Sequence, residues 1–467
     1  MILAAAGAGV LVGAGYALSP LTALCVPVII AMSRWAARDL EPSERRWFFS
    51  LIGIAVIARL LMIAALFLSS DGRMPFETFF GDELFFKNRS VWIRNIGLDV
   101  PISPADVIYA FEDVGISSYL YALAFVQAVA GKAPYGIHVL NSACYLTGAL
   151  VLFRIARRSF GGVAALAGLS ILLFTPSLFM WSISALKEPS YTLAAALEFA
   201  CALQVARAPR LRAKVLWFLG VIAGAIALES LRRGGSMVAV AGISAGYLFG
   251  YVLPRPRLLL GTLAVLPFVI AVLLWAPPIQ QRALAAVRTG AFYHTGHVLS
   301  PGYSYHSLKS DYYRDGLRIY QMPARDAVDY LFWSYVAYVT EPVPWRIESR
   351  ALLAYLPEQM FWFVLLALVP FGIAEGARRD PMLTMLLVAH GLGAVTVVAV
   401  SSGNIGTLIR HRGLLMPYLV WLAGLGLYQL VNIAVTPSPV ALTNGVSDVL
   451  AQGPFRRNGP KTLVERR

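Results

Sequence analysis

An adjacent pair of carboxylates, Asp82 and Glu83, follows a long apolar stretch that ends near residue 69. Neighbouring side chains point in different directions on any backbone, so one carboxylate can face a reacting hydroxyl group while the other binds a cation or anchors the loop. A carboxylate close to a low-dielectric membrane surface also tends to have a raised pKa, which suits a general base. The pair is therefore a candidate for proton removal, although a solvated acidic loop has the same composition.

Three basic groups lie beside other apolar stretches. They are Lys187, the pair Arg232 and Arg233, and the run Arg410, His411 and Arg412. Arginine matches phosphate oxygens through two parallel hydrogen bonds, and lysine adds a point charge. If the three groups meet at one face of a membrane, they form a rim that binds an anionic ligand such as a lipid phosphate. Contact with lipid head groups, or snorkelling, explains any one group taken alone.

The overall composition is that of a membrane protein. Of the 467 residues, 58% are hydrophobic and 14% are charged, whereas a soluble domain has about 25% charged residues. Uncharged stretches long enough to cross a bilayer recur along the chain. The composition excludes a water-soluble enzyme and predicts an all-α polytopic membrane protein. The sequence contains no Walker A, Gly-rich dinucleotide or HExxH motif, so soluble nucleotide donors and metalloprotease chemistry have no support.

Hydropathy and helix-breaking residues place the spans. Residues 2 to 33 are too long for one span and contain Ser19-Pro20, which predicts a hairpin of two short helices. Ten further spans are predicted at 47–69, 136–156, 161–179, 189–207, 215–230, 235–253, 258–277, 357–377, 381–401 and 413–433. We therefore expect about 11 to 12 transmembrane helices. They form a single domain at 1–435, which is followed by a basic, disordered cytoplasmic tail at 436–467.

The distribution of charge predicts the topology. The net charge of +14 would suggest a nucleic-acid partner in a soluble protein, but here the basic residues cluster in short connections, which the positive-inside rule places in the cytoplasm. The clusters are Arg34/Arg38/Arg45/Arg46, Arg154/Arg157/Arg158, Arg207/Arg210/Arg212/Lys214, Arg255/Arg257, Arg378/Arg379 and Arg456/Arg457/Lys461/Arg466/Arg467. Residues 70–117 hold eight acidic and four basic residues and are expected outside. We expect membrane lipids and no nucleic acid as partners.

Two large extracytoplasmic loops are predicted, at 70–135 and 278–356. The first contains the apolar stretch Tyr119–Ala130, which is too short to span and is expected to lie along the membrane interface. The second is rich in Tyr, Trp and His, which is typical of an interfacial aromatic belt or of a surface that stacks on carbohydrate.

Two charged residues, Arg59 and Glu198, are predicted near the middle of spans. An unpaired charge there costs about 2.5 to 3.5 kcal/mol on insertion scales. We expect the two to pair with one another and to stabilise the bundle. His390 is expected to be a hydrogen-bonded packing residue rather than a proton carrier.

The order of these features resembles the GT-C superfamily of integral membrane glycosyltransferases, which includes protein O-mannosyltransferases and the lipid A aminoarabinose transferase. In that group, an acidic motif on the first large extracytoplasmic loop precedes an interfacial helix and a span that ends in a basic turn. Gly81-Asp82-Glu83, the stretch Tyr119–Gly131 and the span from Asn141 to Arg157-Arg158 look like that progression. The stretches 184–189 and 403–412 are similar to segments of bacterial members from polysaccharide gene clusters.

The resemblance implies a polyprenyl-phosphate-linked sugar as donor and a glycan, lipid or protein as acceptor, on the extracytoplasmic side of a bacterial inner membrane. Asp82 would match the catalytic base of an inverting transfer, and Glu83 would support it or hold a divalent cation. The leaving group is then an anionic lipid phosphate. Lys187, Arg232, Arg233, Arg410, His411 and Arg412 would bind the donor phosphate, with Arg410 and Arg412 foremost.

Two alternatives stay open. A polysaccharide polymerase or an O-antigen-ligase-like enzyme also uses polyprenyl-linked sugars, but it would place its key residues in the loop at 278–356 and would not need Asp82. A lipid or sugar flippase would be no enzyme, and it would carry polar residues through the middle of the membrane, where this sequence has few.

Overall fold

A computed structural model describes residues 19–69, 82–113, 115–131, 136–299, 306–308, 321–346 and 350–435, together with four isolated positions before residue 19. Within these ranges the chain is helical, and the only β-type pairing is an isolated bridge between His306 and Asn404. The predicted all-α fold is confirmed. Residues 436–467, predicted as a disordered tail, lie outside the described residues.

The helices follow one another with short connections. The first half of the chain contains α2 (Pro20–Ala36), α3 (Pro42–Ser69), α4 (Asp82–Gly97), α5 (Pro104–Ala110), α6 (Ser118–Ala130), α7 (Gly136–Phe160), α8 (Gly162–Phe174), α9 (Pro176–Ile183), α10 (Glu188–Arg207) and α11 (Leu211–Leu231). The second half contains α12 (Gly235–Val252), α13 (Pro256–Trp275), α14 (Pro277–Leu299), α16 (Ala324–Thr340), the short 3-10 helix η2 (Pro344–Arg346), α17 (Arg350–Arg379), α18 (Pro381–Ser401), α19 (Ile405–Arg412) and α20 (Met416–Val435).

Proline and capping side chains mark many of the helix starts. Proline is the first residue of α2, α9, α13 and α18, where its missing N–H is not needed and its fixed φ suits a helix. Asp380 caps α18 by accepting from Leu383 N at 3.0 Å, and Asn404 caps α19 by accepting from Thr407 N at 2.7 Å. The capped start of α19 fixes the helix that carries the run 410–412.

Eight of the described helices are long and apolar enough to cross a membrane. They are α3, α7, α11, α12, α13, α17, α18 and α20. The pair α8 and α9 passes the same test together with a 62° bend between them, which gives up to nine spans. This confirms a polytopic helical membrane protein. The predicted number of 11 to 12 also included α10, which is not among the eight, and a hairpin of which α2, with 17 residues, is the described part.

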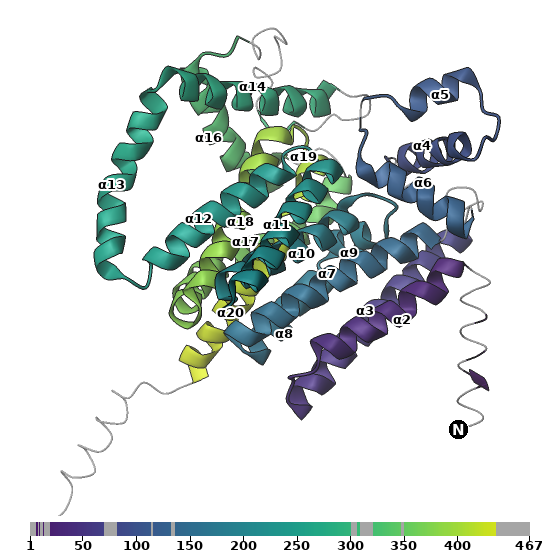
Figure 1. The fold of residues 1–467 in the computed structure, drawn as a ribbon, viewed down its shortest axis with the longest axis horizontal. Helices are drawn as coiled ribbons and strands as arrows, with labels where there is room; N and C mark the ends of the chain where they lie inside the picture. The colour runs from purple at the N-terminus through teal and green to yellow at the C-terminus, as the bar shows by residue number, and fades with distance from the viewer. Residues whose placement is uncertain are drawn as a thin grey trace, which may run out of the picture.

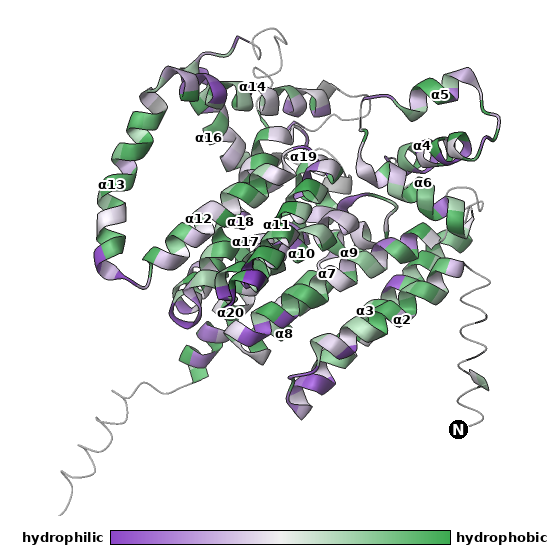
Figure 2. Cartoon of the chain, viewed as in Figure 1, coloured by the Kyte–Doolittle hydropathy of each residue, from purple (hydrophilic) through white to green (hydrophobic). Residues whose placement is uncertain are grey.

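The basic connections meet at one end of the bundle, here named the basic end and formed by the turns α2–α3, α7–α8, α10–α11 and α17–α18. Arg157 pairs with Glu44 at 3.3 Å, which joins the α7–α8 turn to the α2–α3 turn. Asp380 pairs with Arg207 and accepts from Ser159 Oγ at 2.7 Å, which adds the other two turns. Figure 2 shows hydrophilic residues gathered near helix ends and apolar ones along the helices. Four of the six predicted cytoplasmic clusters therefore share one end.

The opposite end, here named the site end, carries several helices that are too short or too polar to cross a membrane. Figure 1 shows α4, α5 and α6 on one side of it, α14 and α16 on the other, and α19 between them. The predicted interfacial stretch in the first loop is the helix α6. It exposes Tyr121, Phe125 and Val129 along one face and buries Tyr119 and Leu123 on the other, as an interfacial helix requires.

A break between α8 and α9 redirects the chain toward the site end. Pro176 lacks the N–H that would continue the helix, so carbonyl groups at the end of α8 need other donors. Tyr145 Oη donates to Leu172 O at 2.6 Å, and Arg59 Nη2 donates to Leu173 O at 3.0 Å. Arg59 also donates to Ser182 Oγ at 2.8 Å and thereby joins both sides of the break. The buried Arg59 at this helix break thus donates a hydrogen bond to a backbone carbonyl that would otherwise need water as its donor.

The predicted pairing of Arg59 with Glu198 is wrong. Arg59 is bound to backbone and hydroxyl oxygens at the α8–α9 break, whereas Glu198 faces His390 with 3.5 Å between Oε2 and Nε2. Depth in the membrane can be estimated from sequence, but the direction in which each helix turns its side chain cannot, and the two residues face different neighbours.

Candidate active site

Three residues far apart in the sequence meet at the centre of the site end. Arg410 in α19 donates through Nη1 to Asp82 Oδ2 at 2.5 Å and through Nε to Glu188 Oε1 at 2.8 Å. Asp82 is the first residue of α4 and Glu188 the first of α10, so both carboxylates lie at helix N-termini, where negative charge is favoured. Arg410 thus bridges the acidic pair of the first loop to the start of α10.

Arg232 and His411 extend this arrangement. Arg232, at the end of α11, lies 4.0 Å from Glu188 Oε1 and donates to the ring of His411, with Nε2 at 2.7 Å. Ser402 Oγ lies 2.9 Å from the other ring nitrogen of His411. Burial, together with the charges of Arg232 and Arg410, holds the pKa of His411 well below its usual range. His411 is therefore a neutral ring between two arginines, not a cation.

Lys187 adds a further positive charge beside Glu188. Its ammonium lies 6.0 Å from the centre of the Phe86 ring, and burial with the charge of Arg232 lowers its pKa to about 8. Asp82 and Glu188 carry two negative charges, and Lys187, Arg232 and Arg410 carry three positive ones, so this group, here named the site cluster, has a net charge of about +1 near neutral pH. A cluster with surplus positive charge is suited to an anionic ligand.

The two carboxylates of the acidic pair have different surroundings. The side chain of Asp82 is 48% exposed, whereas that of Glu83 is 4% exposed. Glu83 Oε1 accepts from Ala185 N at 2.5 Å, in the segment between α9 and α10, and burial raises its pKa to about 7. Asp82 is open to solvent, while Glu83 anchors the backbone that leads to Lys187.

Side chains of α7 hold this segment, residues 184–187, in place. Asn141 Nδ2 donates to Ser184 O at 2.7 Å and to Leu186 O at 2.9 Å. His138 Nδ1 lies 2.9 Å from Ile183 O, the last carbonyl of α9. Non-helical backbone at membrane depth is tolerated where protein groups satisfy it, and in transporters such interruptions mark binding sites. The interruption here presents Lys187 and Glu188 to Arg410.

Arg233 and Arg412 do not join the site cluster. Arg233 is exposed and donates to Tyr293 Oη of α14 at 2.9 Å. Arg412 is buried and donates to Tyr338 O and to Gln359 Oε1, each at 2.6 Å, and also to Glu341 O. Successive residues of a helix are turned by about 100°, so residues 410 and 412 lie on opposite faces of α19. The structure brings together Asp82, Lys187, Arg232, Arg410 and His411 and leaves these two predicted arginines elsewhere.

Glu188 and Glu229 are the site residues that the sequence did not single out. Glu188 is shared by Arg410 and Arg232. Glu229 holds the turn that carries Arg232, because its Oε2 accepts from Gly234 N at 3.1 Å and from Ser236 N at 3.0 Å. A carboxylate beside Lys187 at the start of an apolar stretch was a usable signal for Glu188, because an unpaired charge there is costly.

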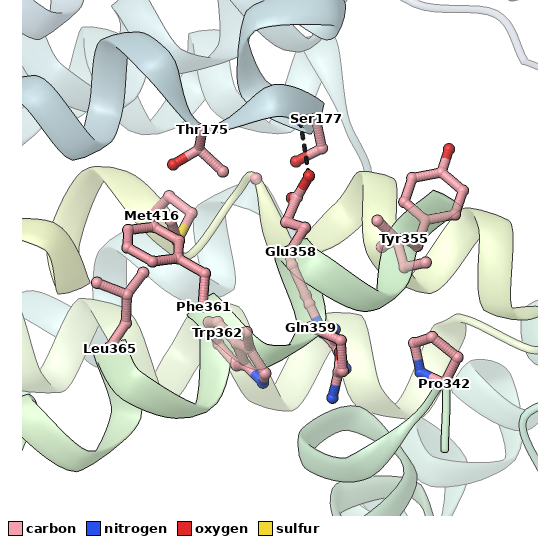
Figure 3. A pocket seen from close by; sticks show the side chains of 13 residues that line it. Thr175, Ser177, Pro342, Tyr355, Glu358, Gln359, Phe361, Trp362, Leu365 and Met416 are labelled. Atoms are coloured by element: carbon pink, nitrogen blue, oxygen red, sulfur yellow. Dashed lines mark hydrogen bonds between the residues drawn. The ribbon is translucent and has the colours of Figure 1, made fainter. Parts of the chain in front are cut away.

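Two small cavities flank α9. One, of about 10 Å³, is lined by Glu188 and Arg410 with Trp181 and Thr192. The other, of about 30 Å³, is lined by Arg412, Glu358 and aromatic residues of α17. Figure 3 shows Glu358 reaching across this second cavity to Ser177, whose N–H donates to it at 2.9 Å. Arg410 and Arg412 of α19 thus line separate cavities.

In the described ranges, no group of three or more His, Cys, Asp or Glu residues is arranged to hold a metal ion. Glu83, suggested above as a cation ligand, faces the backbone N–H of Ala185 instead of open space. Comparison of the chain with protein-family models, with curated proteins and with solved structures finds no match.

Proposed function

We propose that the chain is a membrane glycosyltransferase that moves a sugar from a polyprenyl-phosphate-linked donor to an acceptor hydroxyl group. One observation carries the proposal. An exposed carboxylate, Asp82, lies directly beside a partly buried group of cations, and the whole group has a surplus of positive charge. A base next to an anion-binding cluster is what a transfer with a phosphate leaving group needs.

The proposed orientation follows from the charge distribution. Four of the basic turns meet at the basic end, which the positive-inside rule assigns to the cytoplasm. The site end then faces the extracytoplasmic side, where a lipid-linked donor is available from the outer leaflet. Residue composition rich in Ala and Arg supports a bacterial inner membrane as the location.

In the proposed reaction, Asp82 takes the proton of the acceptor hydroxyl group while that oxygen attacks the anomeric carbon. The bond between the anomeric carbon and the phosphate oxygen breaks, and its electron pair leaves with the lipid phosphate. A single displacement of this kind inverts the configuration at the anomeric carbon. Lys187, Arg232 and Arg410 would stabilise the charge that develops on the phosphate, which is usually the largest catalytic contribution. The phosphate would compete with Asp82 for Arg410 and so release the base for the acceptor.

Asp82→Asn tests the proposal. Purified protein in liposomes is supplied with a radiolabelled polyprenyl-phosphate sugar, and membranes of a strain lacking the protein supply the acceptor. We expect the variant to lose about 100-fold or more of the rate of transfer, because general-base catalysis typically contributes that much. Asp99→Asn is the matched control, since Asp99 is exposed and its positive φ of 53° suits asparagine equally well.

The outcomes are distinct. Full activity of Asp82→Asn would refute its role as the base. A wild-type protein that consumes none of a panel of lipid-linked sugars would refute the transferase proposal itself.

The polymerase or ligase alternative has one supporting observation. The helix α14 of the second loop reaches the site, because His297 lies with its ring centre 6.1 Å from that of His411 and Tyr293 binds Arg233. That alternative predicts loss of activity when His297 is replaced and none when Asp82 is replaced, so the same assay separates the two functions.

A further inference from the structure

A second group of ionisable side chains lies inside the bundle and takes no part in the proposed transfer. Glu198 is near the middle of α10 and His390 near the middle of α18, and both have zero exposure. Glu198 Oε2 lies 3.5 Å from His390 Nε2. The two residues are buried where an ionised side chain without a partner is strongly disfavoured.

The hydrogen bonds of His390 define where its protons are. Its Nδ1 lies 2.8 Å from Leu386 O. Because a carbonyl oxygen only accepts, Nδ1 must carry a proton and donate it. Within the part of the chain that the structure describes, Nε2 of His390 and both carboxylate oxygens of Glu198 have no hydrogen-bond partner. The nearest polar group that each can turn to is the other.

Among the residues that the structure describes, the surroundings of the pair supply no other charge. The titratable groups that face Glu198 are Tyr191 and Cys201 on α10, Tyr247 on α12 and Tyr418 on α20. Phenol and thiol groups are uncharged near neutral pH. The rings of Phe199 and Tyr418 also pack against His390, with centres 5.2 and 5.4 Å away. Only His390 can therefore balance an ionised Glu198 among the described neighbours.

The pair is closed off from water by two glycines. A Cβ atom on Gly224 of α11 would come within 2.6 Å of Glu198 Cβ, and one on Gly242 of α12 would come within 2.5 Å of His390 Cγ. Neither cavity beside α9 is lined by Glu198 or His390. Both side chains have no exposed surface, and this burial favours a state of the pair with no net charge.

We infer that Glu198 and His390 form a proton-binding site that holds a single proton between the carboxylate and Nε2. The proton resides either on Glu198, which then donates to neutral His390, or on Nε2 of an imidazolium that donates to the carboxylate. The two forms have the same atoms and no net charge. The shared proton joins α10, which begins with Glu188, to α18, which leads into α19 and Arg410. The shared proton thereby helps to keep Glu188 and Arg410 in fixed positions relative to one another.

Nitrogen NMR of ¹⁵N-histidine-labelled protein in detergent tests the inference. The chain has six histidines, so the His390 signal can be assigned by its loss in His390→Gln. We expect the wild-type signal to show a proton on Nδ1, and the Nε2 signal to shift in Glu198→Met, which removes the group that faces Nε2. A His390 signal with its proton absent from Nδ1, or an Nε2 signal that Glu198→Met leaves unchanged, would overturn the inference.

A double-mutant cycle supplies a second measurement. Glu198→Met and His390→Leu are made singly and together, and unfolding is followed in mixed micelles. If the pair shares a proton, the unfolding equilibrium constant of the double variant should be roughly 3- to 20-fold smaller than the value expected from adding the two single effects. Additive effects would contradict the inference. Glu198→Gln should unfold like the wild type, because its amide can donate to Nε2; a variant clearly more stable than the wild type would show that Glu198 is an unpaired charge.

Discussion

Arg412→Gln should destabilise the protein without touching the proposed chemistry. Arg412 donates to three buried acceptors, the carbonyls of Tyr338 and Glu341 and Gln359 Oε1. At about 2 kcal/mol for each bond to a charged group, their loss costs about 6 kcal/mol. Burial lowers the pKa of Arg412 to about 10, so its charge is disfavoured in the folded state by about 3 kcal/mol, which the substitution recovers. The net loss is about 3 kcal/mol.

The assay compares three arginine variants by unfolding in mixed micelles and by sugar transfer. Arg410→Gln should lose transfer and also about 3 kcal/mol of stability, because Asp82 is half exposed to water but the buried Glu188 keeps only Arg232 at 4.0 Å. Arg233→Gln is the control, since Arg233 is exposed and binds one hydroxyl group; it should change stability by less than about 0.5 kcal/mol.

The reasoning fails in a recognisable way. If Arg412→Gln is as stable as the wild type but inactive, while Arg410→Gln is active, the two arginines have the opposite roles. In that case the second cavity, beside Arg412, would be the place where the anion binds.

Three further changes test other parts of the structure. Burial raises the pKa of Glu83 to about 7, so the folded state binds the proton of Glu83 more tightly than the unfolded chain. The free energy of unfolding should therefore fall as the pH rises from ~4.5 to ~7. Glu83→Gln should remove this pH dependence when unfolding is measured at several pH values. Gly372→Ala should lower the free energy of unfolding by about 3 kcal/mol or more, because the new Cβ would lie 1.9 Å from a backbone oxygen of α20. Gly261→Ala is the control and should stabilise the protein slightly, because nothing lies within 4 Å of its Cβ. Equal effects of the two substitutions would contradict the packing. Tyr145→Phe should lower the free energy of unfolding by about 1 to 2 kcal/mol, because the Leu172 carbonyl at the α8–α9 break loses its donor; an unchanged value would show that another donor replaces it.

Patterns that depend on depth and composition could be predicted from the sequence. Hydropathy predicted the helical membrane fold, and the short apolar stretch in the first loop is α6, a separate helix at the site end. The different surroundings of Asp82 and Glu83 also followed from local geometry. These inferences need only the residues within a few positions of each other.

The direction in which each helix turns its side chains could not be predicted in the same way. Arg410 and Arg412 are equivalent in residue type and flank the same histidine, but once α19 is helical they lie on opposite faces and bind different partners. Arg59 and Glu198 are both charged residues within spans, yet each meets a partner set by helix rotation and by the break at Pro176. Such partners depend on the packing of helices distant in sequence, which no local pattern encodes.

The charge count of the site cluster bears on turnover under the proposed reaction. A sugar joined to a lipid through one phosphate is a phosphodiester with one negative charge, which the net charge of about +1 neutralises. Once the sugar has left, the remaining phosphate is a monoester and carries between 1.5 and 2 negative charges near neutral pH, roughly as phosphoserine does. The spent carrier is then held more tightly than the loaded one. Product release would be the slow step, and once Asp82 has passed the acceptor's proton to solvent, the return of Arg410 to Asp82 would help to expel the carrier.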